Sequence, residues 1–442
     1  MINIVLSDTA FKLKIEAPRE PPIGLSTIAS FMRLKDYSVK VISPTLENWS
    51  IRKTAREIYK INPEVLGLSV IDVNAVNAMK LVEYLRKLGY KGFIVLGGYW
   101  ATLSSHKILE TFSQVDACVR GEGEYTFYEL VKALGSGKDF KCIRGLSYRD
   151  GGNIIENENR PLVNNLDDFP LPARDYTERV INMDSAPAIY TGKGCHGQCS
   201  FCSINAFYEH CSGDKIRTRS PANVVTEMEI LIKNFELPYF TIVDDNFIMP
   251  GKKGAEYIEE FKQEIESRKL KLQFDLMCRV DLIDEELFRK LKSIGLRRVF
   301  LGVESGHENG LKRFNKKITV EKSLKAIATL QNLGLEFTVA LILADPWTNY
   351  EEFETNLNFM KKIRNTFDKD KLILSVSPKI VVHKYTAIYE RLKTEGRLLG
   401  DWFKGYTYEL NPDIRVPLML WELLTGKWPS FFRKLILKIQ TS

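Results

Sequence analysis

Three cysteines, Cys195, Cys199 and Cys202, lie in one short loop after an apolar run and constrain this chain more than any other feature. Closely spaced thiolates are typical ligands of iron-sulfur clusters, and full coordination of a cuboidal cluster by protein takes four of them. Three cysteines would therefore leave one iron open to a small molecule. Glycines at 192, 194 and 197 allow the backbone to turn tightly around such a cluster.

A structural zinc loop is the alternative interpretation of the same cysteines. Zinc takes four ligands in a closed tetrahedron. The fourth ligand would have to be His196, His210 or Cys211, and none of these stands at a second paired spacing. Ligand count and spacing therefore favour an iron-sulfur cluster.

The composition is that of a globular chain long enough for two or three domains. Of its 442 residues, 44% are hydrophobic and 27% are charged, and no apolar run reaches the ~20 residues of a membrane-spanning helix. The start, Met1–Ser7, is typical of a first strand and not of a secretion signal. A labile cluster needs a reducing compartment, so we expect a cytoplasmic protein. The net charge of +7 is modest, and we expect no nucleic-acid partner.

Short apolar runs alternate with helical patterns in the N-terminal third. This alternation predicts a doubly wound parallel sheet with helices on both faces, and ligands of such sheets bind beyond the carboxyl ends of the strands. The runs are Ile2–Leu6, Val39–Ile42, Val65–Ser69 and Phe93–Leu96, with helical patterns at 25–35, 50–61 and 74–88.

The same alternation returns around and after the cysteine loop. It predicts six strands, each followed by a helix, with polar residues at their carboxyl ends where barrel enzymes place their active residues. The predicted strands are Ala188–Tyr190, Tyr239–Val243, Leu272–Met277, Arg298–Gly302, Phe337–Ile342 and Leu374–Ser377.

The Cys-x3-Cys-x2-Cys loop, the six strand-helix units and the Gly-Val-Glu-Ser-Gly pattern at Gly302–Gly306 together resemble the radical S-adenosylmethionine (SAM) enzymes. The resemblance implies that Cys195, Cys199 and Cys202 hold a 4Fe-4S cluster. It implies that the open iron binds SAM and that the reduced cluster cleaves SAM to a 5′-deoxyadenosyl radical. By the same resemblance, the expected SAM contacts are Asp244, Arg279, Glu304 and Ser305.

Three segments, Pro21–Ser26, Leu96–Thr102 and Asp116–Glu124, resemble the cobalamin-binding domain that is joined to one large class of radical SAM enzymes. No Asp-x-His-x-x-Gly motif is present, so the resemblance implies cobalamin without a histidine below the cobalt, and we expect a surface or capping role for His106. The alternative is a domain that keeps the sheet and binds no corrin. The expected cobalamin contacts are Ser69, Gly97, Gly98, Thr102, Gly121 and Glu122.

These features predict an α/β protein with four parts. An N-terminal doubly wound, flavodoxin-like cobalamin-binding domain (1–142) is followed by a linker (143–183), a partial (β/α)6 radical SAM barrel (184–384) and a helical C-terminal extension (385–442). The apolar and basic segment Trp428–Ile439 fits packing over its own domain, which we favour, or a helix lying on a membrane surface.

The resemblance implies a radical SAM enzyme that transfers methyl groups with cobalamin to an unactivated carbon of a small-molecule or lipid-like substrate. An external electron donor such as flavodoxin or ferredoxin would reduce the cluster. Cyclisation, ring rearrangement or carbon-carbon coupling without methyl transfer is the second hypothesis, and a non-enzymatic metal or cobalamin-binding module is the third. No residue is assigned a catalytic role, because no strand-end pattern encodes the substrate.

Overall fold

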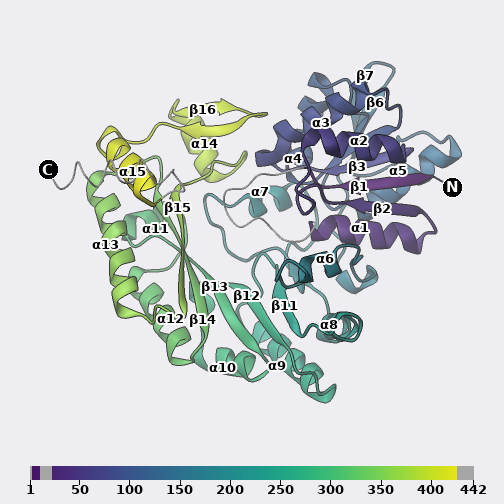
Figure 1. Ribbon diagram of the computed structural model, residues 1–442. Coiled ribbons are helices and arrows are strands. Elements are labelled where there is room, and N and C mark those ends of the chain that lie inside the picture. The colour runs from purple at the N-terminus through teal and green to yellow at the C-terminus, as the bar shows by residue number, and fades with distance from the viewer. Residues whose placement is uncertain (1, 10–21, 426–442) are drawn as a thin grey trace. The chain divides into compact units, whose positions relative to one another are not determined.

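The computed structural model describes residues 2–9 and 22–425, which divide into two compact units (Figure 1). The first unit comprises the described residues up to His196, Ser203–Leu276 and Asp401–Gly405, and the second comprises Gly197–Cys202, Met277–Gly400 and those from Tyr406 on. The division passes through the cysteine loop between His196 and Gly197. Each part of that loop is therefore described with its own unit.

The N-terminal sheet has the strand order β2-β1-β3-β4-β5-β6-β7, and its first five strands are parallel. The predicted doubly wound, flavodoxin-like sheet is thus present. Its strands are β1 (Asn3–Ser7), β2 (Ser38–Ile42), β3 (Val65–Ser69), β4 (Phe93–Gly97), β5 (Ala117–Val119), β6 (Leu146–Asp150) and β7 (Asn153–Glu156).

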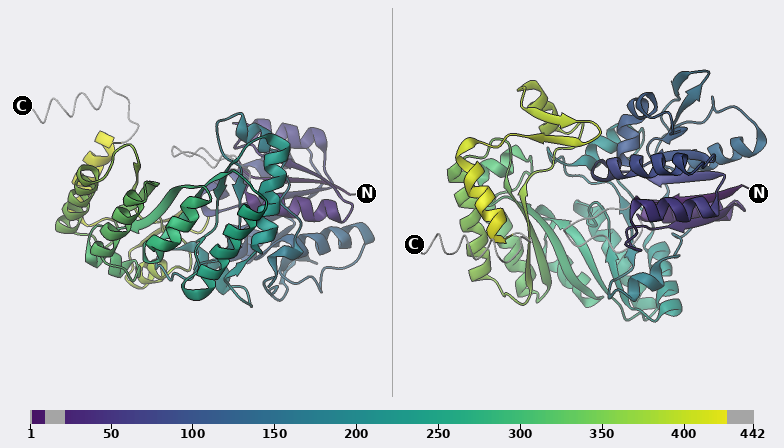
Figure 2. Two further views of the ribbon diagram at one scale, coloured as in Figure 1. Left: turned by 90° about the horizontal axis from the view of Figure 1, so that it is seen from below. Right: turned by 45° about the horizontal axis from the view of Figure 1, so that its top comes forward.

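Two separate apolar clusters cover the two faces of this sheet, which is why its strands are apolar on both sides. On one face α2 (Ile51–Ile61), α3 (Ala75–Lys87) and α4 (Tyr99–Thr111) pack against the strands. On the other face lie α1 (Ile23–Leu34) and α5 (Glu124–Ser136). The helix layers are seen from two further directions in Figure 2.

The predicted linker is partly regular structure. Strand β6 pairs antiparallel with β5, and β7 pairs antiparallel with β6, so residues up to Glu156 extend the first sheet. Gly151 and Gly152, with φ of 55° and 90°, form the tight turn between them, as two-residue hairpins require. The Asp-Gly-Gly sequence is typical of such a hairpin turn. Only the following residues, with the short helix α6 (Thr177–Ile181), connect to the next strands.

All six strands predicted for the second half are present. In the first unit, β11 (Tyr239–Ile242) pairs in parallel with β8 (Ala188–Ile189) and with β12 (Gln273–Arg279), whose last residues enter the second unit. In the second unit, β14 (Glu336–Ala344) pairs in parallel with β13 (Leu296–Glu304) and β15 (Leu372–Lys379). Two short antiparallel strands, β9 (Gly192–Lys193) and β10 (Arg217–Thr218), flank the helix α7 (Ser203–Glu209).

Helices follow these strands as the sequence pattern requires, and polar residues cap the first turn of each except α9, which begins after Pro250. For example, the Ser220 hydroxyl accepts a hydrogen bond from the Asn223 amide at 3.2 Å, and Pro221 occupies the first turn of α8. The helices are α8 (Pro221–Phe235), α9 (Gly251–Ser267), α10 (Glu285–Ser293), α11 (Glu308–Arg313), α12 (Val320–Asn332) and α13 (Tyr350–Thr366).

The C-terminal extension contains the helices α14 (Ala387–Thr394) and α15 (Pro412–Thr425), and also a two-stranded hairpin that was not predicted. The hairpin consists of β16 (Leu398–Asp401) and β17 (Gly405–Tyr408). The segment Trp428–Ile439, for which membrane contact was considered, lies outside the described residues. Between residues 22 and 425, every helix falls short of the length and apolar character that a membrane span needs.

Candidate active site

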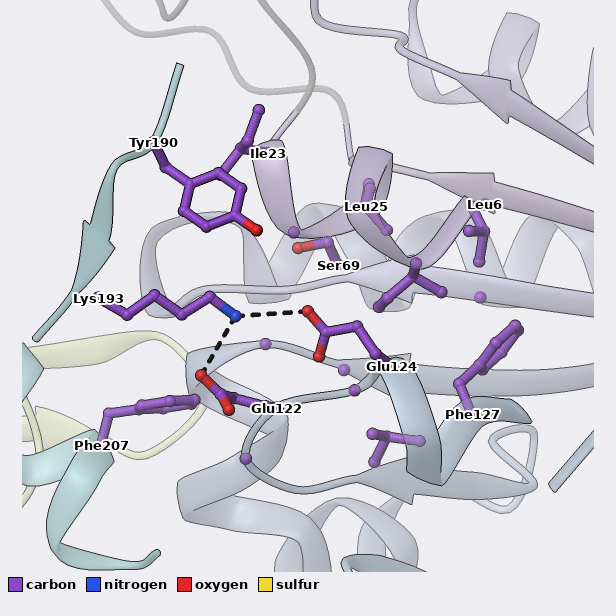
Figure 3. Close-up of a pocket in the computed structure, with 18 of the residues that line it drawn as sticks. Leu6, Ile23, Leu25, Ser69, Glu122, Glu124, Phe127, Tyr190, Lys193 and Phe207 are labelled. Carbon is purple, nitrogen blue, oxygen red and sulfur yellow. Dashed lines mark hydrogen bonds and ion pairs between the residues drawn. The ribbon is translucent and has the colours of Figure 1, made fainter. Parts of the chain in front are cut away.

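A cavity of about 290 Å³ opens in the first unit at the carboxyl ends of the N-terminal strands (Figure 3). Leu6, Leu25 and Phe127 contribute apolar walls from β1, α1 and α5. Five of the six predicted cobalamin contacts line the cavity, namely Ser69, Gly97, Gly98, Gly121 and Glu122. The strand ends thus bring together residues from three loops that are far apart in the sequence.

Glycines keep this cavity open. A Cβ atom on Gly97 would have only the Val119 carbonyl oxygen within 4.0 Å, and a Cβ on Gly24 would have no neighbour within 4 Å. Gly98 is different, because its φ of 92° and the Val70 oxygen 2.8 Å from an added Cβ make a side chain unfavourable there. Space at this end of the sheet therefore comes from side chains that are absent.

Thr102, the sixth predicted cobalamin contact, does not line the cavity. Its hydroxyl donates to the Gly98 carbonyl at 2.9 Å and accepts from the Gly121 amide at 3.0 Å. Thr102 thus ties two of the lining loops to each other. His106 lies on α4 with its side chain 60% exposed and its Nδ1 3.7 Å from the Glu156 carboxylate, as the predicted surface role requires.

The cavity fits one part of cobalamin. Largely apolar walls with a few polar groups, here the Ser69 hydroxyl and the backbone at Gly97 and Gly98, suit the nucleotide tail. The residues therefore fit the cofactor through its tail.

Buried charged residues, whose pairing the sequence analysis did not predict, line one side of the cavity. Lys193 Nζ lies 3.2 Å from Glu122 and 3.4 Å from Glu124 (Figure 3). The Arg217 guanidinium donates two hydrogen bonds to the Glu122 carboxylate at 2.9 and 2.8 Å. Burial alone would lower the pKa of Lys193, but the two carboxylates raise it by more. Burial likewise raises the pKa of Glu122, and its two cationic partners lower it below its usual value. Lys193 and Glu122 therefore both stay charged.

Two aspartates at the end of β11 hold the backbone just before the cysteines. The Asp244 carboxylate accepts hydrogen bonds from the Thr191 amide at 2.7 Å and from the Thr191 hydroxyl, and Asp245 accepts from the Gly194 amide at 2.8 Å. Burial raises the pKa of Asp244 to about 6, although the bonds from Thr191 act to lower it. Both carboxylates therefore position the strand β9 that leads to Cys195.

The remainder of the cysteine loop, Gly197–Cys202, is anchored within the second unit. The Ser200 amide donates to the Phe314 carbonyl at 3.0 Å, and the Ser200 hydroxyl donates to the Arg313 carbonyl at 2.6 Å. Asn315 donates to the Gln198 carbonyl at 2.7 Å. The Cys202 amide donates to the Cys199 carbonyl at 3.1 Å, so the loop turns tightly between these two cysteines.

Three predicted SAM contacts lie in the second unit. Arg279 Nη1 is 3.3 Å from the Cys199 sulfur. Glu304 has a φ of 72° beside a bulge in β13 and pairs with Lys316 at 3.4 Å. Ser305 is 1% exposed, and its hydroxyl is 3.1 Å from the Asn356 side-chain oxygen. Asp244, the fourth, is bound to Thr191 as described above, so contact of all four with SAM stays a prediction.

The three loop cysteines are half-buried. Across residues 2–9 and 22–425, no three side chains of His, Cys, Asp or Glu converge as a ligand set, and the loop itself is divided between the units. Their role as cluster ligands therefore stays a prediction at the level of single residues. Cys278 is 5% exposed, as core packing predicts.

Comparison with known proteins assigns the two halves of the chain. Residues 189–360 match the radical SAM superfamily, and residues 17–131 match the B12 binding domain. An uncharacterized methyltransferase of Pyrococcus horikoshii is 30% identical over 370 residues, which are 82% of this chain and 78% of that protein. The chain therefore belongs to the radical SAM superfamily, with a B12-binding domain ahead of its radical SAM domain.

Two further relatives agree with this assignment. The anaerobic magnesium-protoporphyrin IX monomethyl ester cyclase of Rubrivivax gelatinosus is 28% identical over 71% of this chain, which spans 57% of that protein. The structure of OxsB, a cobalamin-dependent SAM radical enzyme with aqua-cobalamin and SAM bound, has a TM-score of 0.76 at 19% identity. That match covers 93% of this chain and 64% of the other, and it confirms the fold.

Family membership decides between the alternatives that the sequence left open. The protein is a radical SAM enzyme, so the non-enzymatic module is excluded, and the family implies a 4Fe-4S cluster instead of zinc. The B12-binding domain makes cobalamin its second cofactor. Enzymes of this kind act on small molecules and need a reductant.

Proposed function

We propose that this protein transfers a methyl group, with cobalamin, to an unactivated carbon of a small-molecule or lipid-like substrate. One observation carries the proposal. Gly192 and Lys193, which line the cavity, stand directly before the cysteine loop. Two residues of extended chain span at most about 7 Å, so Cys195 begins within that reach of the cavity wall. A cofactor tail in this cavity would lie beside the start of the cluster loop.

When bound, the cofactors supply a 5′-deoxyadenosyl radical that removes hydrogen from the substrate and a methyl group that replaces it. The chain's own residues bind and orient. The glycines at 97 and 98 leave room for the cobalamin tail, and the apolar walls exclude water. Glu122, Lys193 and Arg217 fix the strands beside the cavity.

The proposed SAM contacts differ in how firmly their polar side-chain atoms are already bonded within the protein. Asp244 and Ser305 are engaged in buried hydrogen bonds, which favours a supporting role for both. Glu304 is paired only loosely with Lys316, at 3.4 Å, and its strained backbone turns it out of the regular strand. Of these three, Glu304 is our first candidate for a direct contact with SAM.

Methyl transfer is testable with SAM that carries an isotopic label in its methyl group. The anaerobically reconstituted protein would be given cobalamin, an external electron donor such as flavodoxin or ferredoxin, and candidate substrates. We expect labelled product, 5′-deoxyadenosine and a cobalamin absorption spectrum, and a Cys199→Ala control should keep the cobalamin spectrum but form neither labelled product nor 5′-deoxyadenosine. Product without label, formed together with 5′-deoxyadenosine, would contradict methyl transfer.

Cyclisation or carbon-carbon coupling without methyl transfer is the second candidate. The relative from Rubrivivax gelatinosus, a cyclase, matches 71% of this chain at 28% identity and therefore supports it. The same labelled reaction separates the two candidates, because a cyclase would convert its substrate and leave the label in methionine.

A further inference from the structure

The guanidinium of Arg279 is held in place from two sides. Its Nε and Nη2 atoms bond to the two carboxylate oxygens of Asp281 at 2.9 and 3.3 Å, and Nη2 also donates to the Lys316 carbonyl at 2.8 Å. The residue is 8% exposed. Its remaining terminal nitrogen, Nη1, is thereby directed at the Cys199 sulfur 3.3 Å away.

The loop leaves room for this contact. A Cβ atom on Gly197 would lie 2.4 Å from Arg279 Nη1 and 3.0 Å from its Cζ, so any larger residue would displace the guanidinium. The carbonyl of Lys316 that receives Arg279 belongs to the same segment that binds Gln198 and Ser200. Loop and guanidinium are therefore fixed against one common support.

We propose that Arg279 is a positioning residue which donates a hydrogen bond to the Cys199 thiolate and thereby raises the reduction potential of the cluster. The inference rests on the cluster of the proposed function. Hydrogen bonds to cluster sulfurs stabilise the more negative, reduced state, and they are among the factors that set cluster potentials. The guanidinium carries N–H donors and no acceptor, so its contact with sulfur is a donated hydrogen bond.

This role differs from the expected one, in which Arg279 binds the carboxylate of SAM. The paired donors that would suit a carboxylate, Nε and Nη2, are already bonded to Asp281 and Lys316. Nη1 is directed at sulfur instead. Arg279 therefore acts on the cluster through its ligand.

The test measures the midpoint potential of the reconstituted cluster by redox titration followed by electron paramagnetic resonance, without SAM, cobalamin or substrate. Arg279→Gln should shift the potential to a more negative value. Because this change also removes the cation that pairs with Asp281, the double variant Arg279→Gln/Asp281→Asn removes the ion pair as a whole. We expect the double variant to keep most of the shift. Arg298→Gln, which breaks a pair with Glu336 on other strands, is the matched control and should leave the potential unchanged.

A wild-type potential in the double variant would overturn the proposal, since the single variant would then report only the loss of the Arg279 cation beside the Asp281 carboxylate. An unchanged potential in Arg279→Gln would also overturn it, and weaker SAM binding in a separate binding measurement on that variant would return Arg279 to the carboxylate role. If the glutamine variant assembles no cluster, Arg279→Lys, which keeps the positive charge, takes its place in the test. Its shorter reach should lose the bond to Cys199 and lower the potential, and a wild-type value would contradict the proposal. None of these potential measurements requires methyl transfer. The role of Arg279 and the methyl-transfer function can therefore fail independently of each other.

Discussion

The carboxyl ends of the N-terminal strands and those of the later strands carry opposite kinds of residue. At the first, Gly97 and Gly98 leave a space, and apolar side chains surround it. At the second, Asp244, Arg279 and Glu304 fill the strand ends with charged groups that bond to the chain itself. The first end is open because its glycines have no side chains. At the second end, charged side chains are fixed by bonds to the chain itself. The first arrangement suits the admission of a large cofactor, and the second suits a loop that must not move.

The largest effect is expected at the cysteine loop. Replacing Cys195, Cys199 or Cys202 with alanine removes a thiolate from a cluster that already has one open iron, and water is a poor substitute. Each variant should lose cluster iron and sulfide after anaerobic reconstitution and form no 5′-deoxyadenosine. Cys211→Ala and Cys278→Ala are the matched controls and should retain both. A full cluster in any one loop variant would refute that ligand assignment.

A larger side chain at Gly97 should weaken cobalamin binding and leave cluster assembly unchanged. In Gly97→Leu the new side chain would enter the cavity, and overpacking of ~1–3 kcal/mol corresponds to roughly 5- to 150-fold weakening of cobalamin binding. Gly97→Ala adds a methyl group with no close neighbour and should bind nearly as the wild type does. Cobalamin absorbance after gel filtration would measure occupancy. If Gly97→Leu bound cobalamin normally, the tail would lie elsewhere.

The sequence predicted the residues at the carboxyl ends of the N-terminal strands better than the contacts at the ends of the later strands. Glycines after apolar strands are visible in the sequence, and five of the six predicted cobalamin contacts do line one cavity. Strand and helix positions followed from periodicity in both halves. The hairpin β6–β7 was missed because its strands carry more polar residues than the predicted apolar runs, although Gly151 and Gly152 gave a signal.

Partners of buried charges could not be predicted, because they depend on which segments the fold brings together. Glu122 was assigned to cobalamin, and no local pattern points to Arg217, 95 residues away in the sequence. Likewise, Arg279 was assigned to SAM because arginine suits carboxylates, whereas its nearest acceptors include the sulfur of Cys199. In both cases the sequence identified a residue at the site, but it could not predict which group that residue would contact.

A moderate effect is expected from the buried charges beside the cavity. Glu122→Gln leaves Arg217, whose side chain is 2% exposed, without its carboxylate, and breaking such a pair costs ~3 kcal/mol. Amide hydrogen exchange in β9 and β10 should therefore accelerate on the order of 100-fold. Glu83→Gln, which breaks an exposed pair on α3, is the control and should leave these amides unchanged. Unaltered exchange in Glu122→Gln would show that the charges do not hold the strands.

The smallest effect concerns the pH dependence of stability at Asp244. Burial raises its pKa from 3.8 to about 6 in the folded protein, so between these values the folded state binds more protons than the unfolded state. Stability from this group is therefore lost as the pH rises from about 4 to about 6. Asp244→Asn can still accept from the Thr191 amide, and its NH2 group can donate to the Thr191 hydroxyl, without burying a charge. The thermal midpoint of the variant minus that of the wild type should accordingly increase across this pH range. Asp275→Asn, at a partly exposed carboxylate in β12, is the control. If the difference in thermal midpoint between Asp244→Asn and the wild type stayed constant with pH, the pKa of Asp244 would not be raised in the folded protein.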